Sequence, residues 1–315
     1  MTSVLARCSA ILTISLILGL AVGTAEAQRR RGNPRGGSDS ENAQAAPEGP
    51  QPTVNDIDEI AARLNSSNED EVREAIDLLS VIDHPRVVPP LADLLRSGRS
   101  DEVVDRALNA LRGLASPTSI DVLVEFSHHR RARARRLAYQ ALAAIEDRRI
   151  PALLEQGLRD SDRSVRATCA RQLGEIGATR SVDTLFLAFD RGVVEAAAAI
   201  GKLGDRGSVA RFTEHLGQVP LSVMLSGYTE YVRRRDIPEE VKIQIVDRLG
   251  EVSGPLVRQF LQRFLDTLPT RGRNRLRDTV VNTLRRIPGH AGSARGETVS
   301  AESDAARDQA AGGGE

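Results

Sequence analysis

The chain has 315 residues with 43 basic and 43 acidic side chains, so its formal net charge is zero at neutral pH. This balance excludes a uniformly basic surface for nucleic acid or membranes and leaves local patches as the places where charge could act. Aromatic residues make up only 3% and Trp is absent, which favours packing of aliphatic helices over a β-sandwich or barrel.

The N-terminal segment has the layout of a signal peptide. Arg7 precedes an apolar run over residues 9–23, and Ala25-Glu26-Ala27 follows as a small-residue cleavage motif. The run is shorter than the roughly 20 residues that a membrane-spanning helix needs. We expect residues 1–27 to be a signal peptide cleaved between Ala27 and Gln28. The mature chain would then have no transmembrane span and be exported to the periplasm or the extracellular space, and an uncleaved anchor helix is the alternative.

Two polar segments flank the part of the chain that has helical periodicity. Residues 28–52 and 288–315 are rich in Gly, Ser and charged residues and have little apolar surface to offset the entropy lost on ordering. We expect a disordered linker and a disordered tail there. Residues 53–287 are predicted to fold.

An apolar stripe with sequence offsets 0, 4 and 7 recurs through the first part of this region. The offsets place three side chains on one face of an α-helix, where they can pack on a neighbouring helix. Successive stripes begin 32, 31, 31 and 27 residues apart, which gives a repeat of about 31 residues. The stripes are Ala75-Leu79-Ile82, Ala107-Leu111-Leu114, Ala138-Leu142-Ile145, Cys169-Leu173-Ile176 and Ala196-Ile200-Leu203.

A second stripe, with offsets 0, 3 and 7, precedes each of these, so each repeat is predicted to be an antiparallel pair of helices. The predicted fold is all-α, a right-handed α-solenoid (α-α superhelix) of HEAT-like repeats. The first-helix stripes are Ile57-Ile60-Leu64, Val88-Leu91-Leu95, Ile120-Leu123 as a partial member, Pro151-Leu154-Leu158, Val182-Leu185-Phe189 and Val209-Phe212-Leu216.

The pattern loosens after Leu216, so regular repeats are predicted over 53–216 and irregular helical repeats that cap the array over 217–287. The second-helix stripe returns as Ile245-Leu249-Val252 and Val280-Leu284-Ile287. A helix is predicted between these two stripes, and an additional helix over 221–235. An end repeat has to cover the apolar face that its missing neighbour would have covered.

Residues 158–177, LRDSDRSVRATCARQLGEIG, carry an Asp loop, a Val-Arg pair and a Leu-Gly-x-Ile-Gly ending. This segment resembles the short HEAT-like repeat named after phycobilisome lyases. The resemblance implies a scaffold fold with many uses. The loop Asp is expected to cap the second helix, where Arg73, Arg135 and Arg166 recur near the helix start. A lyase- or hydroxylase-type enzyme, or an enzyme-associated subunit, is the alternative that the resemblance leaves open.

The residues that carry chemistry do not form a known motif. None of the five histidines pairs with another at i, i+4, and the sequence has no HExxH, CxxC, Gly-x-Ser-x-Gly or phosphate loop. The His-Glu pairs of proteins that resemble deoxyhypusine hydroxylase are absent too. Cys169 is predicted to be a packed thiol, and the Asp160–Asp162 loop a helix cap rather than a cation site. We predict no catalytic residue, cofactor or metal.

The most basic stretch is residues 128–136, HHRRARARR. Residues 128–180 contain twelve Arg against six acids, whereas residues 53–96 contain ten acids against four Arg. Three interpretations stay open: a solvated charged face, a docking surface for an acidic protein segment, and a site for phosphate or an anionic polymer. The scarcity of stacking aromatics argues against nucleic acid as the partner. The candidate partner-binding residues are Arg130, Arg131, Arg133, Arg135, Arg136 and Arg166.

Taken together, the repeats and the N-terminal segment predict a non-enzymatic exported scaffold. It would bind a protein partner, with an acidic segment as one candidate, through the surface formed by successive second helices. Self-association through the acidic and basic ends is a further open alternative.

Overall fold

The computed structural model of the protein describes residues 52–270 and 274–288. The signal peptide, its cleavage between Ala27 and Gln28, nearly all of the 28–52 linker and the tail beyond residue 288 lie outside the described residues. Contacts divide the chain into two units, 1–49 and 50–315, and all the described residues belong to the second. The described ranges hold fifteen α-helices, four short 3-10 helices and no β-strand, which confirms the all-α prediction.

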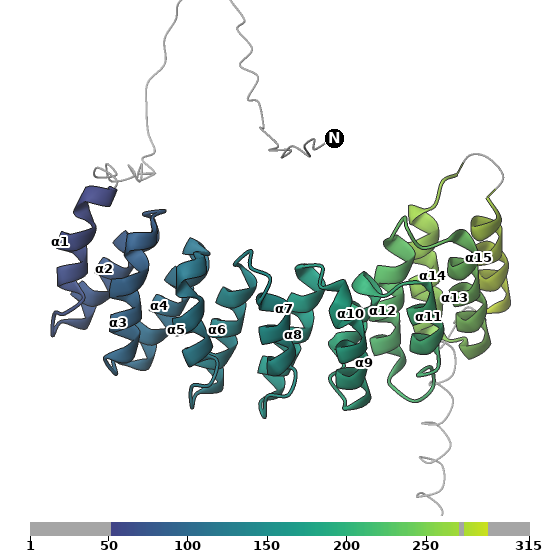
Figure 1. The fold of residues 1–315 in the computed structure, drawn as a ribbon. Helices are drawn as coiled ribbons and strands as arrows, with labels where there is room; N and C mark the ends of the chain where they lie inside the picture. The colour runs from purple at the N-terminus through teal and green to yellow at the C-terminus, as the bar shows by residue number, and fades with distance from the viewer. Residues whose placement is uncertain (1–51, 271–273, 289–315) are drawn as a thin grey trace, which may run out of the picture. The chain divides into compact units, whose positions relative to one another are not determined.

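Five pairs of antiparallel helices follow one another in the first part of the array (Figure 1). Each pair corresponds to one predicted repeat, because every apolar stripe begins within a helix or at its edge. The pairs are α1 (Ile57–Arg63) with α2 (Glu69–Ser80), α3 (Val88–Arg96) with α4 (Asp101–Leu114), α5 (Ile120–Phe126) with α6 (Ala132–Ala143), α7 (Ile150–Gly157) with α8 (Arg163–Glu175) and α9 (Val182–Asp190) with α10 (Ala196–Leu203).

Five more helices complete the array. The helix predicted as an additional one over 221–235 is α12, which packs on α10 as the next member of the row of second helices. Helix α12 packs in the array through one face, on which Met224, Tyr228 and Tyr231 are all fully buried. These helices are α11 (Arg206–Thr213), α12 (Leu221–Arg233), α13 (Glu239–Val252), α14 (Pro255–Thr267) and α15 (Arg275–Arg286).

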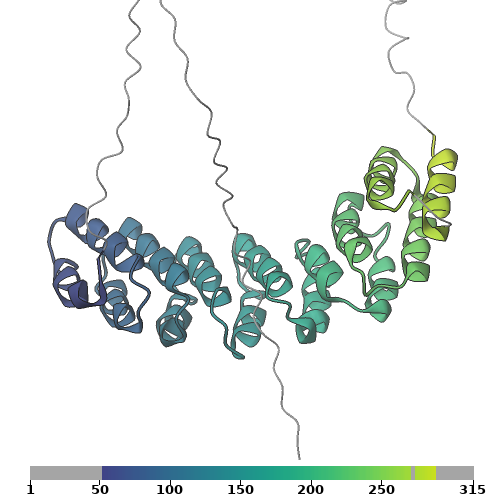
Figure 2. The same cartoon turned by 90° about the horizontal axis from the view of Figure 1, so that it is seen from above.

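The helices form two layers, which Figure 2 shows from above. In the second layer each helix packs on the next, from α2 through α4, α6, α8 and α10 to α12. A first helix such as α5 packs mainly on the second helix of its own pair. We call the exposed side of α2, α4, α6, α8, α10 and α12 the second-helix surface. Because these helices touch one another, this surface is continuous across the repeats.

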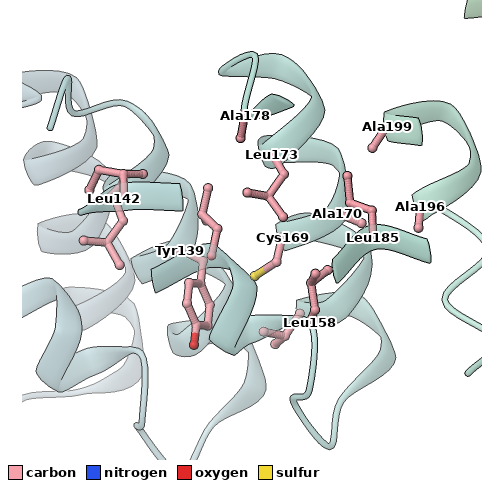
Figure 3. Packing of buried hydrophobic residues seen from close by; sticks show 14 of the residues in the cluster. Tyr139, Leu142, Leu158, Cys169, Ala170, Leu173, Ala178, Leu185, Ala196 and Ala199 are labelled. Carbon is pink, nitrogen blue, oxygen red and sulfur yellow. The ribbon is translucent and has the colours of Figure 1, made fainter. Parts of the chain in front are cut away.

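The core lies between the layers and follows the predicted stripes. Figure 3 shows part of it, where Leu142 of α6 and Cys169 and Leu173 of α8 are all fully buried. The prediction is wrong for two residues that it places in the core: Ile176 is 36% exposed and Val252 is 45% exposed. Ile176 follows the last residue of α8, and Val252 is the last residue of α13.

Glycine permits a close helix contact between α10 and α12. A Cβ atom built on Gly201 would lie 2.2 Å from the carbonyl oxygen of Gly227, and one built on Gly227 would lie 2.5 Å from the Phe212 ring. A Cβ atom does not approach other atoms that closely, so a side chain at Gly201 would push α10 away from α12, and one at Gly227 would displace the Phe212 ring of α11. The two glycines thus determine how closely α10 packs against the neighbouring helices.

Replacing Gly201 with Ala is therefore expected to lower the free energy of unfolding by about 1–3 kcal/mol, the usual cost of overpacking. Gly113 in α4 is the matched control, because a Cβ atom there would meet no atom within 4 Å. Gly113→Ala is expected to stabilise the protein by up to about 1 kcal/mol through helix propensity. Urea denaturation of the two variants measures both effects, and equal effects of the same sign would contradict the close contact.

Candidate partner-binding surface

The basic stretch 128–136 runs from the end of α5 into the first turns of α6. Arg130 and Arg133 are exposed, whereas Arg131, Arg135 and Arg136 are partly buried. The fold therefore divides the predicted cluster into side chains that face solvent and side chains that contact neighbouring repeats.

Arg135 connects the third repeat to the fourth. Its Nε and Nη2 donate to the two carboxylate oxygens of Asp160 at 2.8 and 2.7 Å, in the planar geometry that an arginine–carboxylate pair favours. Its Nη1 donates to the carbonyl oxygens of His129 and Arg130 at 3.0 and 3.1 Å. The Arg135 and Asp160 side chains are only 13% and 9% exposed. Arg135 is thus a structural residue that joins two loops.

The Asp160–Asp162 loop is structural as well. Asp162 caps α8, since its carboxylate accepts hydrogen bonds from the backbone N–H groups of Ser164 and Val165 at 2.8 and 3.2 Å, which confirms the predicted cap. Arg166 donates to the carbonyl oxygens of Asp160 and Ser161 at 2.8 and 2.9 Å. Within the described ranges no group of three or more His, Cys, Asp or Glu side chains could hold a metal ion.

Arg131 and Arg133 face the preceding repeat. Arg131 forms ion pairs with Asp101 at 2.9 Å and with Asp105 at 3.0 Å, and Arg133 forms an ion pair with Asp105. Asp105 lies in α4, so these contacts join α4 to α6. Arg136 has a buried Nε without a hydrogen-bond partner among the described residues.

The structure therefore gives Arg131, Arg135 and Arg166 contacts within the protein. Arg130 and Arg133 keep exposed guanidinium groups, although Arg133 also contacts Asp105. The binding role of the six predicted arginines stays a prediction. A test of that role has to use Arg130, because replacing the other members for which contacts are described would disturb the contacts between repeats.

A groove on the second-helix surface was not singled out by the sequence. It has a volume of about 370 Å³, is open to solvent, and lies between α8, α10 and α12. Val194, Ala198, Ala199 and Val223 form its apolar lining. Its polar lining residues are Arg171, Glu195, Lys202, Ser222 and Ser226.

One position of the repeat explains the groove. This position comes two residues after the first member of each second-helix stripe. In the first four repeats it is occupied by Asp77, Asn109, Gln140 and Arg171, and in the fifth repeat by Ala198. All five are exposed or partly exposed. The small side chain of Ala198 leaves a hollow at the place where the earlier repeats carry larger polar side chains. An alignment of the repeats on their stripes would have shown this change.

Of the charged residues around the groove, the carboxylate has an ion-pair partner and the two cations have none within the described residues. Arg171 and Lys202 are exposed, and neither forms an ion pair within the described part of the chain. Glu195 contacts Arg163 through its Oε1 at 3.4 Å. Its other oxygen, Oε2, is buried and has no hydrogen-bond partner among the described residues. The groove therefore combines two unpaired cations with one unsatisfied acceptor.

Comparison with known families agrees with this repeat architecture. The sequence model of HEAT repeats matches residues 57–143 and 126–199. Residues 57–199 of the chain are HEAT-like repeats. The segment 158–177, on which the resemblance to phycobilisome-lyase repeats rests, lies inside the matched region. The comparison with curated proteins gave no match.

Solved structures match the chain at low sequence identity. The complex of CpcE and CpcF of phycocyanin lyase from Nostoc sp. PCC7120 is 17% identical, covering 79% of this chain and 100% of that chain, with a TM-score of 0.42. A homology model of the full-length AP-3 complex is 15% identical, covering 74% and 51%, with a TM-score of 0.50. Human deoxyhypusine hydroxylase in complex with glycerol is 16% identical, covering 74% and 96%, with a TM-score of 0.38.

Two further properties of the HEAT-like array bear on the predicted sites. Cys169 is fully buried, and desolvation raises the pKa of its thiol well above the usual range, which disfavours a reactive thiolate. No helix in the described ranges is both long enough and apolar enough to cross a membrane.

The ionisation of Asp160 makes the stability of the HEAT-like array depend on pH. Burial of the carboxyl opposes its ionisation, but hydrogen bonds from Arg135 and from the Asp162 backbone outweigh burial and lower its pKa. A lowered folded-state pKa contributes stability above the unfolded-state value of about 3.9, and this contribution is lost as the pH falls through the folded-state pKa.

The Asp160→Asn variant is therefore expected to lose less unfolding free energy than the wild type when the pH falls below about 4. The variant should also be less stable than the wild type at neutral pH, because Arg135 loses its charged partner. Urea denaturation at a series of pH values measures both changes. Identical pH profiles for the variant and the wild type would show that the Arg135–Asp160 pair does not set the acid sensitivity.

Proposed function

We propose that this HEAT-like repeat protein is a non-enzymatic scaffold that binds a protein partner through its second-helix surface. One observation carries the proposal: the stripe position occupied by Asp77, Asn109, Gln140, Arg171 and Ala198 faces solvent in each of five successive repeats. Core packing does not dictate the residue there, so each repeat can present a different side chain to a partner. Repeat arrays commonly bind through extended surfaces of this kind.

The proposal includes export. The apolar run over residues 9–23 and the Ala25-Glu26-Ala27 motif support a cleaved signal peptide and a location in the periplasm or outside the cell. Cell fractionation followed by N-terminal sequencing of the isolated protein tests this part. A mature chain that begins at Gln28 is the expected result, and a full-length chain in the cytoplasm would contradict export.

Affinity purification of the mature chain from its own envelope fraction tests the binding function. A specific protein partner is expected from the intact chain. A variant with Arg130 replaced by Glu is compared with it, because Arg130 is exposed and forms no ion pair within the described residues. Loss of the partner would locate binding at the start of α6, and retention would place it elsewhere on the second-helix surface. Recovery of no specific partner would count against the scaffold.

The proposal that the protein is not an enzyme has a separate test. Elemental analysis and an absorption spectrum of the purified protein are expected to show no stoichiometric metal and no bound pigment. A bound metal or chromophore would favour the alternative of a lyase- or hydroxylase-type activity.

A further inference from the structure

The groove between α8, α10 and α12 has the properties of a site for a short stretch of peptide. Its volume of about 370 Å³ is at the small end of ligand sites, which suits one or two side chains better than a large cofactor. Ala198 and Ala199 lie among its lining residues, and Val194 and Val223 add branched aliphatic surface. An aliphatic side chain placed there would lose contact with water without displacing a protein group.

The depth of this site is a consequence of the helix packing. Gly201 and Gly227 let α10 approach α12, and a Cβ atom on Gly174 of α8 would lie 3.1 Å from the Cα atom of Ala199. The three helices are therefore held close together by their glycines. A hollow bounded by three such helices keeps its shape before a partner arrives, which lowers the entropic cost of binding.

The polar groups at the groove define the chemistry of its occupant. Arg171 and Lys202 present cations without an ion-pair partner in the described ranges, and Glu195 is the single carboxylate beside them. The negative charge of Glu195 is balanced by its ion pair with Arg163, so the groups around the groove have an excess of positive charge facing the solvent. The other oxygen of Glu195, Oε2, is buried, so the groups that a partner can reach at the groove are the two cations.

We propose that this groove binds an acidic segment of the partner protein. One aliphatic side chain of the segment packs on Ala198 and Ala199, and the flanking Asp or Glu carboxylates pair with Arg171 and Lys202. This inference rests on the proposed scaffold function and names the site and the partner chemistry. It places binding two repeats beyond the start of α6, where the sequence pattern alone had placed it.

Binding of synthetic peptides to the intact protein tests the site. The probes are fluorescent, acetylated and amidated peptides in which Leu is flanked by Asp and Glu. One matched set carries Lys in place of the acids, and another carries Ser in place of Leu. Fluorescence anisotropy is expected to show the tightest binding for the acidic Leu peptides, with weaker binding at high salt because the ion pairs are exposed. Equal binding of the acidic and basic sets, or no binding up to millimolar protein, would overturn the proposal.

Three variants locate the binding. Arg171→Glu and Lys202→Glu are each expected to weaken binding about tenfold or more by opposing the peptide carboxylates. Ala198→Gln fills the hollow with the side chain that Gln140 has at the same stripe position, and it should weaken binding of the Leu peptides specifically. Circular dichroism confirms that each variant is folded.

The matched control is Arg112→Glu in α4, an exposed arginine outside the groove that should leave peptide binding unchanged. A loss in the control as large as in Lys202→Glu would show a general charge effect and overturn the assignment to the groove. A partner recovered from the envelope fraction that binds Lys202→Glu as tightly as the wild type would also overturn it while leaving the scaffold function intact. Failure to recover any partner would instead count against the scaffold.

Discussion

Replacing Arg135 with Ala is expected to lower the free energy of unfolding by about 3–5 kcal/mol, the range for removing one partner of a buried ion pair. The variant leaves the Asp160 carboxylate almost enclosed and without its two hydrogen bonds from the guanidinium. It also removes the donor to the carbonyl oxygens of His129 and Arg130. Urea denaturation followed by circular dichroism measures the change.

Arg130→Ala is the control for this result. Arg130 is exposed and forms no ion pair within the described part of the chain, so its loss should change stability by less than about 0.5 kcal/mol. Similar small effects for both variants would mean that the Arg135–Asp160 contact contributes little in solution. A large effect for Arg135 alone also has a practical consequence, since reversing the charge of the whole 130–136 cluster would then unfold the array rather than report on binding.

Replacing Leu173 with Ala is expected to lower the free energy of unfolding by about 2–5 kcal/mol. Leu173 is fully buried in the α8 face of the core shown in Figure 3, so the variant leaves a cavity between neighbouring helix pairs. Because each repeat contacts only its neighbours, the loss should also speed hydrogen exchange in α7 and α8 more than in α2. Chemical denaturation and exchange rates measure the two effects.

Leu187 of α9 is the matched control, because the same side chain is 49% exposed there. Leu187→Ala should change stability by less than about 0.5 kcal/mol. A loss below that value for Leu173→Ala would mean that the residue is not a packed member of the core, and the repeat alignment would be shifted.

The helix pairs were predictable because burial in a repeat array follows a local rule. A helix that docks on neighbours along one stripe shows apolar residues at offsets of three and four, whatever lies farther along the chain. Ala107 and Leu111, or Ala138 and Leu142, are fully buried as that rule predicts. The last stripe member follows the rule less regularly, since Ile82 and Ile145 are buried whereas Ile176 and Val252 are exposed.

The candidate site was less predictable than the fold. The sequence marked residues 128–136 by charge, but charge alone does not distinguish an exposed arginine from one that contacts a neighbouring repeat. Arg171 and Lys202 stand in a less basic context and were not selected, although their side chains border the groove. Ala198 has no polar or charged group that would mark it as a site residue. Its importance is evident only when it is compared with the larger residues at the same position in the other repeats.

By itself the sequence determined the all-α class, the helix pairs and the capping role of Asp162, because periodicity and capping act within a few residues of the chain. Only the tertiary structure decided that Arg135 meets Asp160, 25 residues away, and that α12 continues the row of second helices. It also decided that Ala198 leaves a hollow between α8 and α12. These features depend on how closely separate helices approach, and that distance is set by packing of side chains far apart in the sequence.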